Sequence, residues 1–121
     1  TVIFSSEQDG YAAGEYGTVL NWDGMVWEED RDPPGEEKIY SGAVAGANHI
    51  WFCGQNSLFL YYNGSDWEQV EAESTYDLYA MTMERVDHGW AVGDYGEALL
   101  YRDGRWERRP TAVEESIYAI D

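Results

Sequence analysis

Short apolar runs alternate with glycine-containing polar turns along the whole chain, and this pattern occurs three times. The runs DGYAAGEYGTVLNWDGMVWEE, NHIWFCGQNSLFLYYNGSDWEQV and DHGWAVGDYGEALLYRDGRWERR share their order of apolar, glycine and tryptophan positions. Gly14, Gly54 and Gly93 are 40 and 39 residues apart, and a tryptophan near the end of each run keeps the same spacing. A period near 40 with short alternating segments predicts one four-stranded propeller blade per repeat.

The middle repeat shows the expected order of strands most clearly. Its inner strand is predicted over Lys38–Ala45, the second over Ile50–Cys53, the third over Leu58–Tyr62 and the outer strand over Asp66–Val70. Glycine after the second strand, as at Gly54, permits a tight turn and the close approach of another backbone. The predicted fold class is therefore all-β, a β-propeller of four-stranded antiparallel blades with three blades in the chain.

The third and outer strands of the repeats meet at Asp23-Gly24, Asn63-Gly64 and Asp103-Gly104. Such pairs predict type I′ hairpin turns, because both central residues of that turn need a positive φ. A tryptophan follows each turn within three residues, at Trp27, Trp67 and Trp106. We interpret these side chains as packing residues that hold the third and outer strands against the neighbouring blade, and stacking on a sugar ring is the alternative.

The repeats divide one domain into blades of about residues 1–38, 39–77 and 78–116, with residues 117–121 starting or closing the next inner strand. The joints between blades carry no apolar periodicity, so we expect surface loops there. They are Glu28–Glu37, which contains Pro33-Pro34-Gly35, then Glu71–Asp77 and Arg109–Ser116.

The inner strand has one more copy than the other strands. Tyr40, Tyr79 and Tyr118 are 39 and 39 residues apart, and the opening run TVIF fits the same place before the first repeat. Propellers typically have about four to eight blades, so three alone are expected to leave a bare sheet face at each end. Our preferred hypothesis is a homodimer that completes a six-bladed ring with twofold symmetry. Part of a longer array and a head-to-tail filament are the alternatives.

Charge narrows the range of partners. The chain has 24 Asp and Glu residues against 7 Lys and Arg, a net charge of −17. Nucleic acid and anionic membrane surfaces are excluded as expected partners, because binding them needs basic stripes. Either the acidity is a solvated, self-repelling surface adapted to salt, or an acidic face attracts cations or a basic protein.

Other chemical signals are few. No apolar run approaches the length of a membrane-spanning helix, and the single cysteine, Cys53, is expected to be a small buried side chain. No cofactor is predicted, although the many carboxylates leave a calcium ion as an option. The compartment stays open, with a secreted or cell-surface location slightly favoured.

The repeats also resemble a known group of bacterial propellers. GYAAGEYG with DGMVW and GWAVGDYG with DGRW match the repeat of photosystem II stability-factor-like and Asp-box (BNR-type) propellers, and WFCGQNSL with NGSDW matches it loosely. The resemblance covers all three repeats and implies the propeller fold, whereas such blades serve sialidases, lectins, assembly factors and scaffolds alike.

This chain departs from those relatives in its hairpins and its basic residues. The hairpins lack the Ser or Thr of a full Asp box, and assembly-factor relatives are expected to present basic patches to membrane partners. A sialidase-like site needs clustered arginines for the substrate's carboxylate. Most arginines here crowd one hairpin and its outer strand, without repeating from blade to blade: Arg102, Arg105, Arg108 and Arg109.

Candidate ligand-binding residues lie at the predicted ends of the blades. In a propeller, the joints between blades and the turns between second and third strands share one face, called the crossing face below. That face is expected to be the most negative one. The candidates on it are Glu15, Gln55 and Asp94, and the aromatic candidates least committed to the core are Trp22, Tyr62 and Tyr95.

Two histidines occupy equivalent positions on the opposite face. His49 and His88 lie five residues before Gly54 and Gly93, where the first strand turns into the second. Either they are polar turn residues repeated by duplication, or they share a transition-metal site.

The function predicted from these observations is a non-enzymatic interaction or scaffold module that self-associates or belongs to a larger propeller. No phosphate-binding loop or serine elbow is present, and no catalytic residue is predicted. A carbohydrate-binding, lectin-like propeller is the alternative, because repeated weak sites gain avidity. A glycosidase-type enzyme is the third hypothesis, which depends on two carboxylates at a defined separation.

Overall fold

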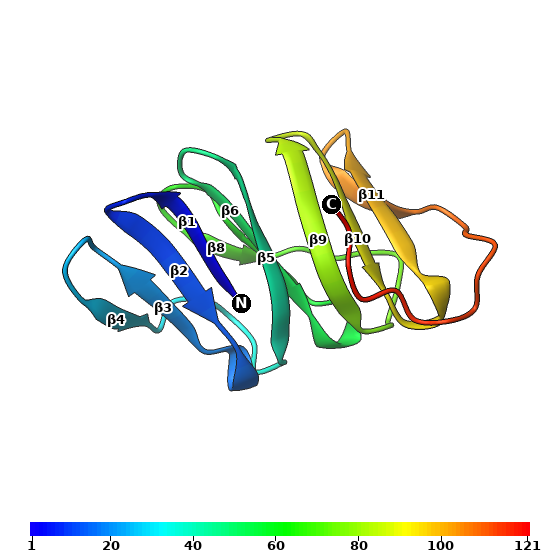
Figure 1. Cartoon of the computed structure of the whole chain (residues 1–121), viewed down its shortest axis with the longest axis horizontal. Coiled ribbons are helices and arrows are strands. Elements are labelled where there is room, and N and C mark those ends of the chain that lie inside the picture. Colours follow the sequence, from blue (N-terminus) through cyan, green and yellow to red (C-terminus); the bar gives the residue numbers. More distant parts are fainter.

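Three twisted antiparallel sheets stand side by side in the computed structural model, which describes residues 1–121 (Figure 1). Each sheet has four strands in chain order, from the inner to the outer strand. Blade 1 contains β1 (Val2–Ser6), β2 (Asp9–Ala13), β3 (Val19–Trp22) and β4 (Trp27–Asp30). Blade 2 contains β5 (Ile39–Gly46), β6 (His49–Gly54), β7 (Phe59–Tyr62) and β8 (Trp67–Gln69). Blade 3 contains β9 (Leu78–Arg85), β10 (His88–Gly93), β11 (Ala98–Arg102) and β12 (Arg105–Arg108). The strands predicted for the middle repeat are confirmed with shifts of one residue at most ends.

The middle blade is buried on both faces, which explains its nearly continuous apolar strands. Alternate residues of a strand point to opposite faces of the sheet. Ile50 and Phe52 therefore join the core against blade 1, whereas Trp51 and Cys53 join the core against blade 3. Burial raises the pKa of the Cys53 thiol, and the side chain is a buried apolar group as expected.

The hairpin turns differ from the sequence prediction in two blades. Asp103 and Gly104 have φ angles of 52° and 80°, as a two-residue type I′ turn requires. In blades 1 and 2 only the glycine has a positive φ, so type I′ turns are wrong there. These loops are longer, and the Asn63 Oδ1 atom accepts hydrogen bonds from the Ser65 and Asp66 N–H groups, both at 2.9 Å. The side chain closes the turn, so a second positive φ is not needed.

The repeated tryptophans of blades 2 and 3 each pack against the blade that precedes them in the chain. The Trp106 ring is 1% exposed and stacks on Phe59 of blade 2 at a centroid distance of 4.1 Å. The Trp67 ring packs on Tyr11 of blade 1, and its Nε1 donates to Asp30 Oδ2 at 2.8 Å. The predicted packing role is confirmed for these two. Trp27 contacts only rings of its own blade and is 39% exposed.

The C-terminal residues contact blade 3 in the way that the start of blade 2 contacts blade 1, although they form no strand themselves. Ile117 N donates to Gly93 O at 2.9 Å, just as Ile39 N donates to Gly14 O at 2.8 Å. Tyr40, Tyr79 and Tyr118 form a column across the inner strands, with ring centroids 5.2 and 4.9 Å apart. No helix in the structure is long and apolar enough to cross a membrane.

Candidate functional site

Blade 3 departs from the other blades where its outer strands reach the crossing face. Glu97 takes the place that Leu58 has in blade 2 and Thr18 in blade 1, yet its side chain is only 3% exposed. Arg108 pairs with Leu99 in the strand register, where the equivalent residue in blade 2 is Gln69. A charged pair in blade 3 thus takes the place of the neutral Leu58 and Gln69 of blade 2.

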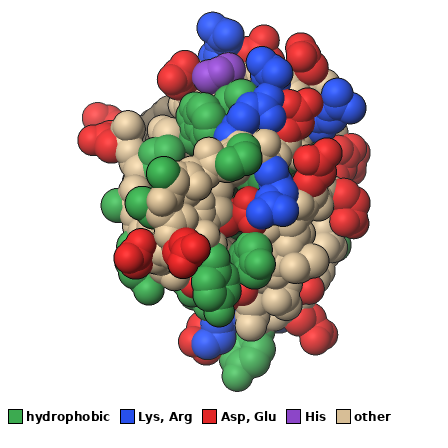
Figure 2. Space-filling model, turned by 90° about the vertical axis from the view of Figure 1, so that its right-hand side faces the viewer, with side chains coloured by type: hydrophobic (Ala, Val, Ile, Leu, Met, Phe, Trp, Pro, Cys, Tyr) green, Lys and Arg blue, Asp and Glu red, His purple; other side chains and the backbone are tan.

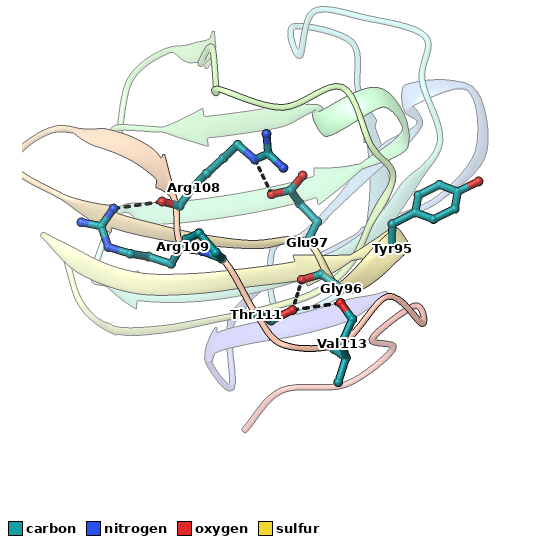
Figure 3. A pocket seen from close by; sticks show the side chains of 8 residues that line it. Tyr95, Gly96, Glu97, Arg108, Arg109, Thr111 and Val113 are labelled. Carbon is teal, nitrogen blue, oxygen red and sulfur yellow. Dashed lines mark hydrogen bonds and ion pairs between the residues drawn. The ribbon is translucent and has the colours of Figure 1, made fainter.

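The Glu97 carboxylate joins the outer strand of blade 3 to the preceding joint. Arg108 Nε donates to Glu97 Oε1 at 2.9 Å (Figure 3). Ser74 Oγ donates to Glu97 Oε2 at 3.0 Å. Both carboxylate oxygens are therefore satisfied, which a carboxylate this buried requires. The guanidinium of Arg108 is held at one nitrogen while its side chain stays 56% exposed.

A hollow of about 350 Å³ opens beside this ion pair (Figure 3). A second hollow of about 340 Å³ lies against the joint formed by residues 72–76, and Glu97 and Arg108 line both hollows. The first is lined by Tyr95, Gly96, Glu97, Arg108, Arg109, Pro110, Thr111 and Val113.

Two exposed tyrosines flank the hollows. Tyr95 is 68% exposed, Tyr76 is 40% exposed, and their ring centroids are 5.2 Å apart. Tyr95 has a φ of 56°, but Tyr16 and Asn56 adopt the same conformation at the equivalent turns. The positive φ is therefore a property of the repeat, and the pairing with Tyr76 is what distinguishes blade 3.

The hairpin of blade 3 carries most of the positive charge of the molecule. Arg102, Arg105 and Arg109 all approach Glu107, at 3.6, 3.0 and 2.7 Å. The hydrogen bond from Arg109 lowers the pKa of Glu107, with a smaller contribution from Arg105. Four arginines including Arg108 thus share two carboxylates, and Figure 2 shows basic side chains gathered at this end of the molecule.

The candidates predicted for the crossing face lie there, one in each blade, and each has a partner within the protein. Glu15 pairs with Lys38 at 3.3 Å, and Gln55 Oε1 accepts from Lys38 N at 3.4 Å. Asp94 Oδ1 accepts from Ser116 Oγ at 2.8 Å. These side chains connect the turns between second and third strands to the joints between blades. Of the three, only Asp94 is next in sequence to a residue that lines the blade 3 hollow, Tyr95.

The aromatic candidates are divided between the two faces. Trp22 lies at the hairpin end, where its Nε1 donates to Glu7 O at 3.4 Å. Tyr62 packs between blades 1 and 2, with its ring 6.2 Å from Tyr11 and 5.1 Å from Trp67. Tyr95 alone of the three lies at the hollow described above.

The sequence did not predict that Glu97, Arg108 and Tyr76 lie together at one site. Aligning the repeats shows a carboxylate at a position that is apolar in blade 2, and this was the available signal. The contact of Glu97 with Ser74 joins residues 23 apart and depends on how the joint returns to the sheet.

The two histidines have separate partners within their own blades. The His49 ring stacks on Tyr61 and its Nδ1 is hydrogen-bonded to the Tyr61 hydroxyl. His88 Nδ1 lies 3.2 Å from Glu84 Oε2 but without hydrogen-bond geometry. No three His, Cys, Asp or Glu side chains come together as ligands of a metal ion would.

Comparisons with known proteins bear on the fold. No protein-family model and no curated protein matches the chain. A solved structure of YCF48 bound to D1 peptide is similar, with a TM-score of 0.80 and 15% identity over 97% of this chain and 41% of that one. A structure of YCF48 from Cyanidioschyzon merolae has a TM-score of 0.72 and 19% identity over 92% of this chain and 40% of that one.

These likenesses show the class of fold. The three sheets match part of a β-propeller, so the predicted fold class is confirmed. The chain spans about two fifths of the solved chains that it matches. At these identities the likeness extends to the fold alone, and the Asp-box resemblance stays a sequence-based expectation.

Proposed function

We propose that this chain is a non-enzymatic propeller module that binds an extended, carboxylate-rich segment of another protein. The surface that binds it is formed by Tyr76, Tyr95, Arg108 and Arg109 at the crossing face of blade 3. The observation that carries the proposal is the cluster of repeat-breaking arginines beside exposed tyrosines in a chain of net charge −17.

The chemistry of this surface suits an acidic peptide. Arg108 is bonded through Nε, so its terminal nitrogens are left to donate to a second carboxylate. Charge-assisted hydrogen bonds from guanidinium to carboxylate are among the strongest in proteins. The Tyr76 and Tyr95 rings offer flat apolar area at low cost in side-chain entropy. The YCF48 chain of similar fold was solved with a D1 peptide, which supports a peptide as the kind of ligand.

Selection of random peptides on the immobilised chain tests this proposal. We expect enrichment of Asp- and Glu-containing peptides, and an affinity loss of at least about tenfold when Arg108→Gln and Arg109→Gln are combined, because charge-assisted hydrogen bonds are removed. Arg31→Gln, at an exposed arginine of blade 1 paired with Glu29, is the matched control and leaves binding unchanged. Enrichment of basic peptides instead would favour a basic partner on the acidic surface and contradict the proposal.

Self-association is part of the same proposal. Blades 2 and 3 each bury one sheet face against the blade before them, while the equivalent face of blade 1 exposes Phe4 and Trp27. Exposed aromatic faces of this kind mark interaction surfaces. Two copies joined through their end blades form the six-bladed homodimer, and the solution mass tests this.

Carbohydrate binding is the second candidate, favoured by the paired Tyr76 and Tyr95 rings beside a guanidinium. A glycan array without binding removes it. A glycosidase is the least supported hypothesis, because both Glu97 oxygens are already hydrogen-bonded within the protein. Glycoside hydrolysis that is lost when Glu97 is replaced would support the glycosidase hypothesis again.

A further inference from the structure

The loop between β3 and β4 of blade 1 carries two exposed apolar side chains. Met25 is 83% exposed and Val26 is 50% exposed. The equivalent positions of blade 2 hold Ser65 and Asp66, which are exposed as well, and the shorter loop of blade 3 has Arg105 in front of its tryptophan. Positions that are polar or charged in the other two repeats are therefore apolar in blade 1.

The backbone of this loop does not require apolar residues. The Asp23 Oδ1 atom accepts hydrogen bonds of 2.9 Å from the N–H groups of Met25 and Val26, as Asn63 Oδ1 does from the two equivalent N–H groups of blade 2. The glycine of the loop has a φ of 97° in both blades. The same turn thus forms with Met-Val in one blade and with Ser-Asp in the other.

Contacts between blades do not explain the apolar pair either. Blade 2 packs against the blade before it, through Trp67 and Tyr11, and yet Ser65 and Asp66 in its loop are exposed. The loop tip lies outside that contact. Met25 and Val26 therefore stay exposed whether or not another blade packs against blade 1. Adjacent exposed apolar side chains of this kind mark interaction surfaces.

The surroundings of the loop are acidic. The four strands of blade 1 and the turns between them contain seven Asp and Glu residues and no Lys, Arg or His. Asp23 precedes the apolar pair, Glu28 follows it, and both side chains are exposed. Glu7 in the neighbouring turn is exposed too, and its backbone carbonyl accepts a hydrogen bond from Trp22 Nε1 at the base of the loop. An apolar tip among carboxylates is complementary to a partner that is both apolar and basic.

We propose that Met25 and Val26 form a docking site for a basic, amphipathic segment of another protein. Apolar side chains of that segment cover the tip, and its basic side chains lie against Asp23, Glu28 and Glu7. Figure 1 shows the loop between β3 and β4 at the end of the molecule away from blade 3. The site is therefore separate from the arginine site of blade 3 and opposite in charge, and the inference does not rest on the acidic-peptide proposal.

Grafting the loop of blade 2 onto blade 1 tests this inference. Met25→Ser combined with Val26→Asp creates a loop that already forms in blade 2, so the near-UV spectrum is expected to stay unchanged. One random-peptide library is selected in parallel on the wild-type chain and on the grafted chain. Peptides enriched on the wild type alone are expected to combine Lys or Arg with large apolar residues. Their affinity is expected to fall at least about tenfold on the grafted chain, because apolar burial is lost.

The charge of the graft makes the direction of the effect informative. Val26→Asp adds a negative charge, so general attraction of basic peptides becomes stronger on the grafted chain, and a loss of affinity reports the apolar contact. Met25→Leu, which conserves volume and apolar character, is the matched control and retains binding. Arg108→Gln combined with Arg109→Gln also retains binding, which distinguishes this site from the arginine site. If the graft does not fold, Met25→Ser alone gives the same comparison at an exposed side chain.

Four results would overturn the inference. The first is that no peptide distinguishes the wild-type chain from the grafted chain, and the second is that the distinguishing peptides lack basic residues. The third is flotation of the wild-type chain, but not the grafted one, with phosphatidylcholine vesicles, which would assign the tip to lipid. The fourth is a two-chain mass that the graft reduces to one, which would assign the tip to a second copy.

Discussion

Glu97 is the residue whose chemistry departs furthest from its repeat. A buried ion pair often contributes little net stability, because desolvation of both charges opposes their attraction. We expect Glu97→Leu, which restores the side chain of Leu58, to change the free energy of unfolding by no more than roughly 1 kcal/mol. Acidic-peptide binding should nevertheless weaken, since Arg108 loses the partner that orients it. Urea unfolding of Glu97→Leu measures its stability, and peptide titration measures its binding. A large loss of stability with unchanged peptide binding would contradict the role of Glu97 in orienting Arg108.

Tyr79 gives the molecule a sensitivity to alkaline pH. Burial, then the hydrogen bond to Asp94, raises the pKa of Tyr79 from its ordinary value of 10.0 to about 12. The folded pKa lies above the unfolded one, so this stabilisation is complete below pH 10 and is lost as the pH rises through 12. Tyr11 acts in the same direction, since burial raises its pKa to about 12. The urea midpoint should fall between pH 10 and 12, and Tyr79→Phe should make this fall smaller without abolishing it. If the midpoint falls equally in wild type and variant, Tyr79 is not a source of the pH dependence.

At the scale of the element, the hairpins of blades 1 and 2 depend on one side chain each. The Asn63 Oδ1 atom accepts two backbone hydrogen bonds that close the loop of blade 2. Asn63→Ala should cost about 1 kcal/mol of unfolding free energy, because both donors then rely on water. Asn63→Asp keeps the acceptor and serves as the control, as Asp23 makes the same bonds in blade 1. Equal urea midpoints for the Ala and Asp variants would show that the cap is irrelevant.

The strands were predictable from sequence and the details of their connections were not. The alternation of apolar and polar residues reflects which side chains are buried, and the spacing of Gly14, Gly54 and Gly93 reflects the repeat. The order of the three blades could therefore be predicted from these two patterns. The turn type depends on loop length. The loop of blade 3 has two residues between its paired strands, whereas the loops of blades 1 and 2 have four, and the Asp-Gly or Asn-Gly pair common to all three gave no sign of this difference. The contact of Ser74 with Glu97 is long-range and leaves no periodic signal.

At the scale of the whole molecule, the two proposed interfaces differ in electrostatics. Joining two copies brings together chains of net charge −17, whereas peptide binding at Arg108 and Arg109 joins opposite charges. Salt screens both interactions, with a Debye length of about 10 Å at about 0.1 M. Raising the NaCl concentration should therefore favour the pair of chains and weaken acidic-peptide binding. Light scattering and peptide titration over one salt series measure the two trends.

Adding calcium to the same measurements distinguishes general screening of charge from binding of calcium at a specific site. Because no three carboxylates converge, CaCl₂ should act on the pair only as NaCl of equal ionic strength does. A further stabilisation at millimolar calcium would instead reveal a site formed by association. Parallel salt trends for pair and peptide would show that one of the two interfaces is misassigned.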